Sequence, residues 1–350
     1  MLKKVLQAEM KPKKIPDAKT YAIIPPDMNY RYFEDATSFP LESEQENFSV
    51  VNAWWFAEAA FLAYCHPGFA RMAYQLAGYD GFKFFQGKGT EVMIAWNERD
   101  SIVSFRGTEL KSSSALHEIL TDLNAVPVSF DQGGKVHKGF LLGLEEVWEG
   151  DDGLCSFLEH FLDDHPRRSM WICGHSLGGA LASLCFARLP RATGLYLFGS
   201  PRVGDQEFVD LFKDRCVWRL EHARDPVPLI PLDIPALNFG YKDSGQMKFI
   251  KKSGELQDNR PQFSLEDSKS KMAQVMEQRE KRNETEKSSA QGEENAGDVF
   301  NKITDHLHQT RKGVQDYLEK IDADFGLNAD DHQPIYYAVK LWNALVSKDS

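Results

Sequence analysis

Apolar and polar positions follow two periods along this chain, and segments of the two kinds succeed one another in a regular order. Apolar residues spaced by three and four positions predict helices, over 49–65, 68–77, 138–148, 153–165 and 177–189, and from Pro334 onward. Short, nearly continuous apolar runs predict buried strands, at 91–97, 101–107, 170–173, 193–199 and 216–222. Repeated strand–helix units predict an α/β fold with right-handed crossovers, in which helices flank a mostly parallel central sheet.

The same pattern divides the chain into regions. Residues 1–48 are rich in proline, lysine and acidic residues, and we expect them to wrap the surface of a single domain over 49–350. From about Phe263 onward aromatic residues become rare and charged residues dense. We therefore expect 264–297 to be a charged, helical or flexible insertion before a C-terminal segment that contains histidines. An amphipathic helix over 298–321 follows this insertion.

Composition and charge exclude several classes of function. The chain has 350 residues, of which 42% are hydrophobic, and its net charge of −11 makes a nucleic-acid partner unexpected. The longest apolar run, 50–64, contains Asn52 and Glu58, so it predicts a core helix and not a transmembrane segment. Residues 1–14 lack the apolar core and cleavage site of a signal peptide, which predicts a cytoplasmic location or export by an unrecognised route.

The stretch "WICGHSLGGALA" carries the candidate chemistry. It places Ser176 in a G-x-S-x-G turn directly between an apolar strand and a helix. Gly174 and Gly178 have no Cβ atom, so strand and helix can approach closely while the bend strains the serine backbone and presents its hydroxyl at the edge of the sheet. The start of the helix adds N–H groups and a positive dipole end that favour a developing oxyanion. His175 and Gly179 are expected to be packing residues.

Several blocks of the chain together resemble the class 3, fungal-type lipases of the α/β-hydrolase superfamily. The blocks are "IVSFRGTE", "VHKGFLLG", "GHSLGGALA", "LYLFGSPRVGDQEF" and "RDPVPLIP", in that family's order and approximate spacing between about Glu91 and Pro231. This resemblance implies the α/β-hydrolase fold and hydrolysis of carboxylic esters.

The resemblance also implies roles for particular residues. Thr108 falls where the family places its first oxyanion-hole residue, and its backbone N–H would act with that of Leu177 on one carbonyl oxygen. The segment 109–121 occupies the family's lid position, but it has no aromatic residue where the family usually has one. Arg106 is expected to tie a loop through a carboxylate and to take no catalytic role.

A nucleophilic serine needs a base, and the base needs an orienting carboxylate, which in this superfamily follow the serine in the order acid, then histidine. Asp225 is the candidate acid, because it comes soon after the predicted strand 216–222 and can lie at the same sheet edge as Ser176. The proline that follows Asp225 favours extended geometry there, and "DPVP" matches the family. Asp233 is the reserve candidate.

Three histidines follow Asp225 and could supply the base. His332 is the preferred candidate, because it lies in a loop just before the last helix, and "DHQPIYYAVKLW" resembles the family's ending. His306 and His308 lie within the amphipathic helix and are reserve candidates, since "TDHL" also resembles some members of the family.

These features favour a serine hydrolase of carboxylic esters, a lipase that cleaves acylglycerols through an acyl-enzyme on Ser176. The alternatives are a phospholipase A1 or a feruloyl or simple esterase, then a thioesterase or peptidase, and last an inactive hydrolase fold that binds a partner. The expected partner is a lipid or ester substrate, which such an enzyme can meet at an oil–water interface. The chemistry needs no metal and no organic cofactor, and the five cysteines have no metal-ligand spacing.

Overall fold

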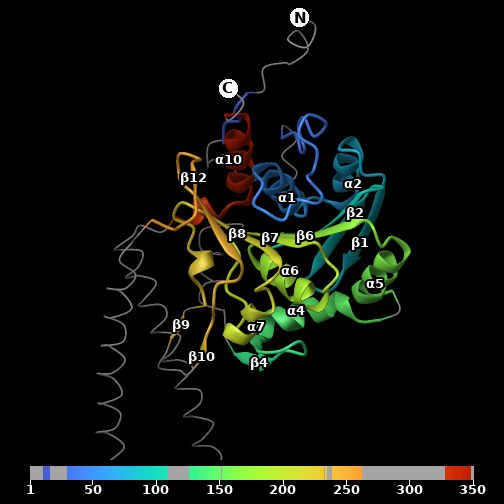
Figure 1. Cartoon of the computed structure of the whole chain (residues 1–350), viewed down its shortest axis with the longest axis vertical. Coiled ribbons are helices and arrows are strands. Elements are labelled where there is room, and N and C mark those ends of the chain that lie inside the picture. The colour runs from blue at the N-terminus through green and yellow to red at the C-terminus, as the bar shows by residue number, and fades with distance from the viewer. Residues whose placement is uncertain are drawn as a thin grey trace, which may run out of the picture.

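A sheet of eight strands runs through the described part of the chain (Figure 1). The computed structural model of the protein describes residues 11–15, 30–108, 126–150, 152–231, 233–234, 239–261 and 328–347. The strand order is β1-β2-β3-β6-β7-β8-β11-β12. The bounds are Gly81–Gln86 for β1, Glu91–Trp96 for β2, Asp100–Phe105 for β3, Ser169–His175 for β6, Gly194–Phe198 for β7, Cys216–His222 for β8, Gln246–Ile250 for β11 and Leu256–Gln257 for β12.

The centre of this sheet is parallel, and its two sides are antiparallel. The strands β3, β6, β7, β8 and β11 pair in parallel, so their carboxyl ends meet at one edge. The strands β1 and β2 continue antiparallel from β3, and β12 pairs antiparallel with β11. Two small ladders are also antiparallel: β4 (Pro127–Ser129) with β5 (Lys135–His137), and β9 (Asp233–Ile234) with β10 (Phe239–Gly240).

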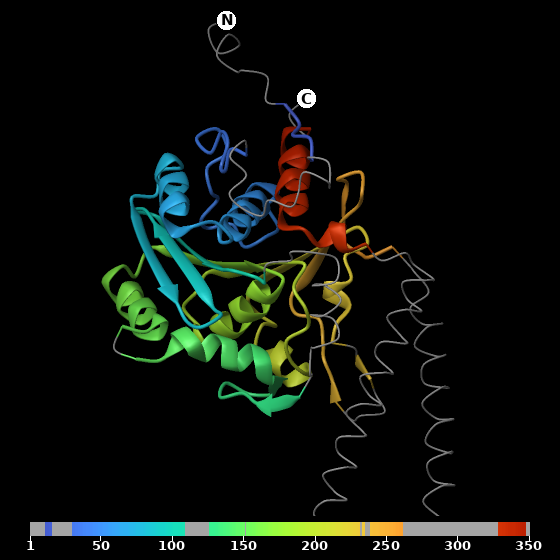
Figure 2. The same ribbon diagram turned by 180° about the vertical axis from the view of Figure 1, so that it is seen from behind.

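Helices cover both faces of the sheet, which Figure 2 shows from behind. One face packs against α1 (Val50–Leu62), α2 (Pro67–Leu76) and α10 (Pro334–Val346), and the other against α4 (Lys138–Trp148), α5 (Leu154–Asp164) and α6 (Leu177–Arg188). The connections contain α7 (Gln206–Asp210) and the 3₁₀ turns η3 (Val227–Leu229) and η5 (Ala329–His332). The mostly parallel sheet flanked by helices, which the sequence pattern predicts, is confirmed. Across the ranges described above, no helix has the length and apolar character needed to span a membrane.

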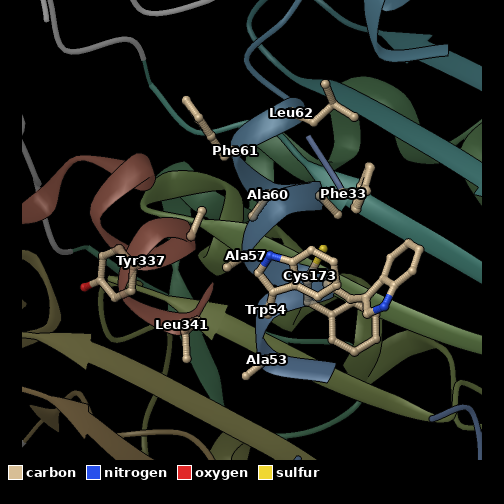
Figure 3. Packing of buried hydrophobic residues seen from close by; sticks show 14 of the residues in the cluster. Phe33, Ala53, Trp54, Ala57, Ala60, Phe61, Leu62, Cys173, Tyr337 and Leu341 are labelled. Atoms are coloured by element: carbon tan, nitrogen blue, oxygen red, sulfur yellow. The ribbon is translucent and has the colours of Figure 1, made fainter. Parts of the chain in front are cut away.

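Aromatic side chains fill the layer between α1, α10 and the sheet. Eleven of the 13 residues of α1 are buried, which is typical of a helix that is apolar on all sides. The rings of Trp54 in α1 and Trp342 in α10 lie 5.4 Å apart. Figure 3 shows Tyr337 of α10 at the border of this cluster, with its hydroxyl pointing away from Trp54. Because His332 ends η5 just before α10, this packing also fixes the segment that carries the candidate base.

The described part of the first 48 residues contributes to this layer. Phe33 is buried between the rings of Trp55 and Tyr74, whose centroids lie 4.9 and 5.2 Å away. Further out, Lys13 exchanges two hydrogen bonds with the side chain of Asn343 in α10: its N–H donates to Oδ1 at 2.7 Å, and Nδ2 donates to its carbonyl at 2.9 Å. The described residues of this N-terminal segment therefore pack into the layer with α1 and α10, and do not only cover its surface.

The structure adds strands that the apolar pattern does not reveal. β1 has the sequence GFKFFQ and is only partly buried, so polar positions interrupt its apolar run. Its Lys83 ammonium lies 5.5 Å from the centre of the Phe85 ring, which lets a lysine occupy this strand. The two strands β11 and β12 are similarly half-buried at the other edge. The lid-like segment 109–121 and the charged insertion 264–297 lie outside the described residues.

Glu58 places a carboxyl group inside the apolar layer of α1. It is fully buried, and its Oε1 accepts hydrogen bonds from the Tyr30 hydroxyl at 2.8 Å and from Trp54 Nε1 at 3.2 Å. Burial raises the pKa of this carboxyl above its ordinary value, although the ammonium of Lys13, 3.8 Å away, opposes the shift. A carboxyl whose pKa is raised by folding contributes stability below its unfolded-state pKa and loses it as pH rises through the folded-state pKa.

We expect Glu58→Gln to remove this pH dependence. The neutral amide oxygen can accept both hydrogen bonds without a buried charge, so the free energy of unfolding near pH 8 should rise above that of the unchanged protein. The gain should shrink toward about pH 4, where the carboxyl is protonated. Chemical denaturation at a series of pH values measures both effects, with Glu44→Gln as an exposed control. A difference that stays constant with pH would contradict this account.

Candidate active site

The turn between β6 and α6 presents Ser176 at the carboxyl edge of the sheet. Its backbone has φ 57° and ψ −131°, a conformation that residues other than glycine rarely adopt. A Cβ atom on Gly174 would overlap the carbonyl of Gly178, and one on Gly178 would overlap the carbonyl of Phe105. These two glycines therefore permit the close crossing of strand and helix. The Ser176 N–H donates to the carbonyl of Phe198 in β7 at 3.0 Å, which ties the turn to the neighbouring strand.

His332 connects Ser176 with Asp225 through its two ring nitrogens. Nε2 lies 2.8 Å from the Ser176 Oγ, and Nδ1 lies 2.9 Å from each carboxylate oxygen of Asp225. A carboxylate accepts, so Nδ1 donates, and Nε2 of the neutral ring is left to accept the serine proton. His332 is fully buried and the other two residues are nearly so, which limits competition from water for these hydrogen bonds.

Three donors hold the carboxylate of Asp225, which lies in the turn after β8. Besides the imidazole of His332, the Val227 N–H donates to Oδ1 at 2.9 Å and the Tyr337 hydroxyl donates to Oδ2 at 2.6 Å. Burial, and next the negative charge of Asp225, raise the pKa of Tyr337 well above its ordinary value. The phenol therefore stays protonated and keeps donating. The carboxylate is fixed in a direction that faces the imidazole.

Gly199, at the end of β7, makes room for these three side chains. Its φ is +52°, and a Cβ atom there would lie 2.6 Å from Asp225 Oδ2, 2.9 Å from the Tyr337 hydroxyl and 3.0 Å from His332 Nδ1. A side chain at this position would enter the site in addition to straining the backbone.

The loop after β3 lies against the start of α6. A Cβ atom on Gly107 would lie 2.5 Å from the carbonyl of His175, and one on Gly178 would overlap the carbonyl of Phe105 at the end of β3. Thr108, one residue further along, is exposed, while Leu177 is half-buried at the first position of α6. The N–H groups in the first turn of a helix have no intrahelical partner, so the Leu177 N–H can serve as a donor to a ligand beside Ser176.

Comparison with known proteins identifies the family of the central part of the chain. Residues 102–234 match the family described as lipase (class 3). We call residues 102–234 the class 3 lipase segment. It includes Ser176, Asp225 and both candidate oxyanion residues, whereas His332 lies beyond it. Because this segment contributes β6, β7, β8 and most of β3 to the parallel centre of the sheet and contains the strained turn, the α/β-hydrolase fold that the resemblance implied is confirmed.

Individual proteins are similar to part of the chain. Over 175 residues the chain is 35% identical to a lipase from Rhizomucor miehei, in an alignment that covers 46% of this chain and 45% of that protein. Over 164 residues it is 32% identical to the secreted mono- and diacylglycerol lipase 1 of Fusarium solani, covering 45% of each. A solved structure of the triacylglyceride lipase from Rhizomucor miehei is 30% identical over 58% of this chain and 80% of that chain, with a TM-score of 0.46. The chain spans less than half the length of these two curated relatives.

The structure brings together some of the residues that the sequence singles out and leaves others apart. In the class 3 lipase segment Arg106 forms an ion pair of 2.7 Å with Glu91, which confirms that it ties its loop through a carboxylate. The reserve acid Asp233 begins the short strand β9. The reserve bases His306 and His308 lie outside the described residues. Within the described ranges, histidine, cysteine and acidic side chains form no cluster that could hold a metal ion.

Sequence reasoning missed three contributors to this site. Tyr337 lies in a helix whose apolar pattern predicts only core packing. Gly199 lies in the block "LYLFGSPRVGDQEF", which resembles the class 3 lipases, but the resemblance gave this glycine no role. The signal for Gly199 was its place directly after an all-apolar strand, where the chain must turn at the carboxyl edge. His175, expected only to pack, is buried with hydrogen bonds at both ring nitrogens, to Tyr64 and to the backbone of His332.

We expect Gly199→Ala to abolish most of the reactivity of Ser176. The methyl group would displace Asp225 or His332, and a displacement of about 1 Å can cost about 100-fold in rate. Labelling of Ser176 by a fluorophosphonate probe measures this loss. Gly78→Ala is the matched control, because Gly78 also has a positive φ, of +91°, but a Cβ atom there meets nothing within 4 Å. The control should lose about 1 kcal/mol of stability and no reactivity. Equal labelling of both variants would contradict a steric clash between the added methyl group and Asp225 or His332.

Proposed function

We propose that this protein is a serine hydrolase of carboxylic esters, a lipase that acts on acylglycerols. One observation carries the proposal: an unbroken chain of hydrogen bonds runs from the strained Ser176 through His332 to Asp225. A hydroxyl, an imidazole and a carboxylate in that order are what a serine nucleophile needs to react near neutral pH.

In the proposed reaction Ser176 attacks the ester carbonyl while His332 Nε2 takes the hydroxyl proton. The imidazole then carries a positive charge, which the carboxylate of Asp225 stabilises through Nδ1–H. The backbone N–H groups of Leu177 and Thr108 would hold the oxyanion of the tetrahedral intermediate. Protonated His332 returns its proton to the departing alcohol, and an acyl ester on Ser176 remains.

Hydrolysis of this acyl-enzyme repeats the same steps with water. His332 takes a proton from a water molecule, the hydroxide attacks the acyl carbonyl, and the proton then returns to the Ser176 oxygen as the carboxylic acid leaves. In both halves of the proposed reaction, His332 Nε2 takes the proton and returns it, and the pair that exchanges the first and the last proton, Ser176 and His332, is already hydrogen-bonded.

The substrate class is supported by the class 3 lipase segment. Proteins similar to part of this chain are named as a lipase and as a mono- and diacylglycerol lipase, and we extend that substrate class to this chain. The triad by itself would serve any acyl transfer, so the substrate class requires its own test.

We expect Ser176→Ala to lose fluorophosphonate labelling and to lower esterase turnover by about 10⁴-fold or more, because the nucleophile is gone. Ser183→Ala is the control: it removes a buried hydroxyl from the same helix, one that donates only to the Gly179 carbonyl at 2.9 Å, and should keep both signals. Failure of the folded, unchanged protein to be labelled would overturn the enzyme proposal.

The same preparation can be offered a panel of substrates. Glyceryl and p-nitrophenyl esters of increasing chain length, below and above their solubility, should be turned over faster than phospholipid, feruloyl, thioester or peptide substrates. Faster turnover of any of these latter classes would replace the acylglycerol assignment and leave the nucleophile assignment in place.

The identity of the base can be tested separately. His332→Ala should lower turnover by about 10⁴-fold or more, because no other group is within reach of the Ser176 proton in the described site. His306→Ala and His308→Ala are the matched comparisons and should remain active. Retained activity in His332→Ala together with loss in either comparison variant would transfer the role of base to that histidine.

A further inference from the structure

Two buried imidazoles hold the backbone on either side of His332. Nε2 of His175 lies 2.6 Å from the carbonyl oxygen of His332, and Nδ1 of His222 lies 2.9 Å from the carbonyl oxygen of Asp331. A carbonyl oxygen can only accept a hydrogen bond, so both ring nitrogens donate. Two consecutive carbonyls of the turn η5 are therefore each bound by a histidine; we call His175 and His222 the imidazole clamp.

The imidazole clamp is anchored next to both hydrogen-bond partners of His332. His175 is the last residue of β6 and immediately precedes Ser176, whereas His222 is the last residue of β8 and lies three positions before Asp225. These two strands flank β7 in the sheet. The clamp thus relates the backbone of η5 to the same two strand ends that position the hydroxyl and the carboxylate.

The surroundings of His175 determine which of its nitrogens carries the proton. The ring is 1% exposed, and its Nδ1 lies 2.8 Å from the Tyr64 hydroxyl. Because Nε2 donates to the His332 carbonyl, Nδ1 of the neutral ring accepts the Tyr64 hydrogen bond. Burial, and next the nearby His332, lower the pKa of His175 well below its ordinary value, which keeps the ring neutral.

His222 has an equally restricted environment. Its ring is 1% exposed and stacks on Tyr336, with centroids 5.4 Å and planes 28° apart. Burial lowers the pKa of His222, although the backbone and charge of Asp331 oppose the shift. The Asp331 carboxylate also accepts the Arg224 N–H at 3.2 Å, so η5 is bound to the end of β8 at a second point.

Neutral donors suit this position in the reaction that we propose. His332 becomes positively charged when it takes the serine proton, and a lysine or arginine at either clamp position would oppose that charge at short range. An imidazole supplies the N–H without the charge, and its flat ring fits between packed aromatic side chains.

We propose that His175 and His222 are positioning residues, which clamp the main chain of η5 so that the His332 ring reaches Ser176 and Asp225 together. This proposal rests on the proposed function, because the clamp matters for rate only if Ser176 is the nucleophile. It differs from a merely structural role in what it affects: the rate of reaction at Ser176 should depend on the donors even in variants that remain stably folded.

The test compares variants that remove each donor with variants that restore it. His175→Leu and His222→Leu keep apolar bulk and lose the N–H. In His175→Gln the side-chain Nε2 can replace the ring Nε2, and in His222→Asn the side-chain Nδ2 can replace the ring Nδ1. His160→Leu is the control, since His160 lies exposed on α5.

We expect each leucine variant to lower kcat and the rate of fluorophosphonate labelling by about 10- to 100-fold, with KM changed by less than about 3-fold, because the loss is one of geometry at the base. The donor-restoring variants should recover to within about 5-fold of the unchanged protein. Thermal unfolding of every variant is measured alongside. Should a leucine variant not fold, Tyr64→Phe tests His175 more mildly, and its labelling rate should fall by about 3- to 10-fold.

Several outcomes would overturn the clamp alone. One is a folded leucine variant that is labelled at the rate of the unchanged protein. Another is a donor-restoring variant that is labelled no faster than the leucine variant, and a third is an unchanged labelling rate in Tyr64→Phe. In each case a labelled parent protein and an unlabelled Ser176→Ala variant would leave the proposed function in place. A parent protein that is not labelled at all would instead overturn the proposed function, and the clamp with it.

Discussion

The imidazole of His332 contacts the hydroxyl of Ser176 with one nitrogen and the carboxylate of Asp225 with the other. The rest of the described structure holds these three groups in place. His332 lies 156 residues from Ser176 and 107 residues from Asp225 along the chain, yet both contacts are shorter than 3 Å. The parallel centre of the sheet solves half of the problem, because the carboxyl ends of β6 and β8 meet at one edge. The His332 ring comes from a third segment, η5, which has to be held so that the ring lies between Ser176 and Asp225.

The aromatic layer between α1 and α10 fixes the position of that segment. Trp342 packs on Trp54, and the buried surface of α10 holds the helix against the sheet; removing a buried tryptophan typically costs about 3–5 kcal/mol. The same helix turns Tyr337 in the opposite direction, where its hydroxyl binds Asp225. Apolar packing and polar positioning therefore come from two sides of one helix, so the stability of this layer and the geometry of the site are linked.

Electrostatics in the site follow from its burial. Asp225 is a nearly buried carboxylate whose hydrogen-bond partners are an imidazole, a phenol and a backbone N–H, none of which is permanently charged. The two histidines that hold η5 are kept neutral by burial. In the low dielectric of such an interior a charge on His332 interacts strongly with the one carboxylate that faces it. In the reaction that we propose, this arrangement favours the transfer of a single proton from Ser176 to the ring.

What the sequence by itself determined were the features that local spacing encodes. Strand and helix periods predicted the parallel sheet, and the G-x-S-x-G stretch predicted the strained turn at Ser176, because a strand, a turn and a helix contiguous in the chain interact through near neighbours. Sequence order and the end of a strand pointed to Asp225. Its place in a loop before the last helix, together with the family resemblance of that ending, favoured His332 over His306 and His308, but the sequence did not show which ring contacts Ser176. Only the tertiary structure decided which imidazole lies beside Ser176, why Gly199 must lack a side chain, and that His175, His222 and Tyr337 hold the partners in place. Most of these contacts join residues more than 100 positions apart, and at Gly199 groups from the turn after β8, from η5 and from α10 meet. They exist only after the packing of α10 on the sheet has brought the segments together.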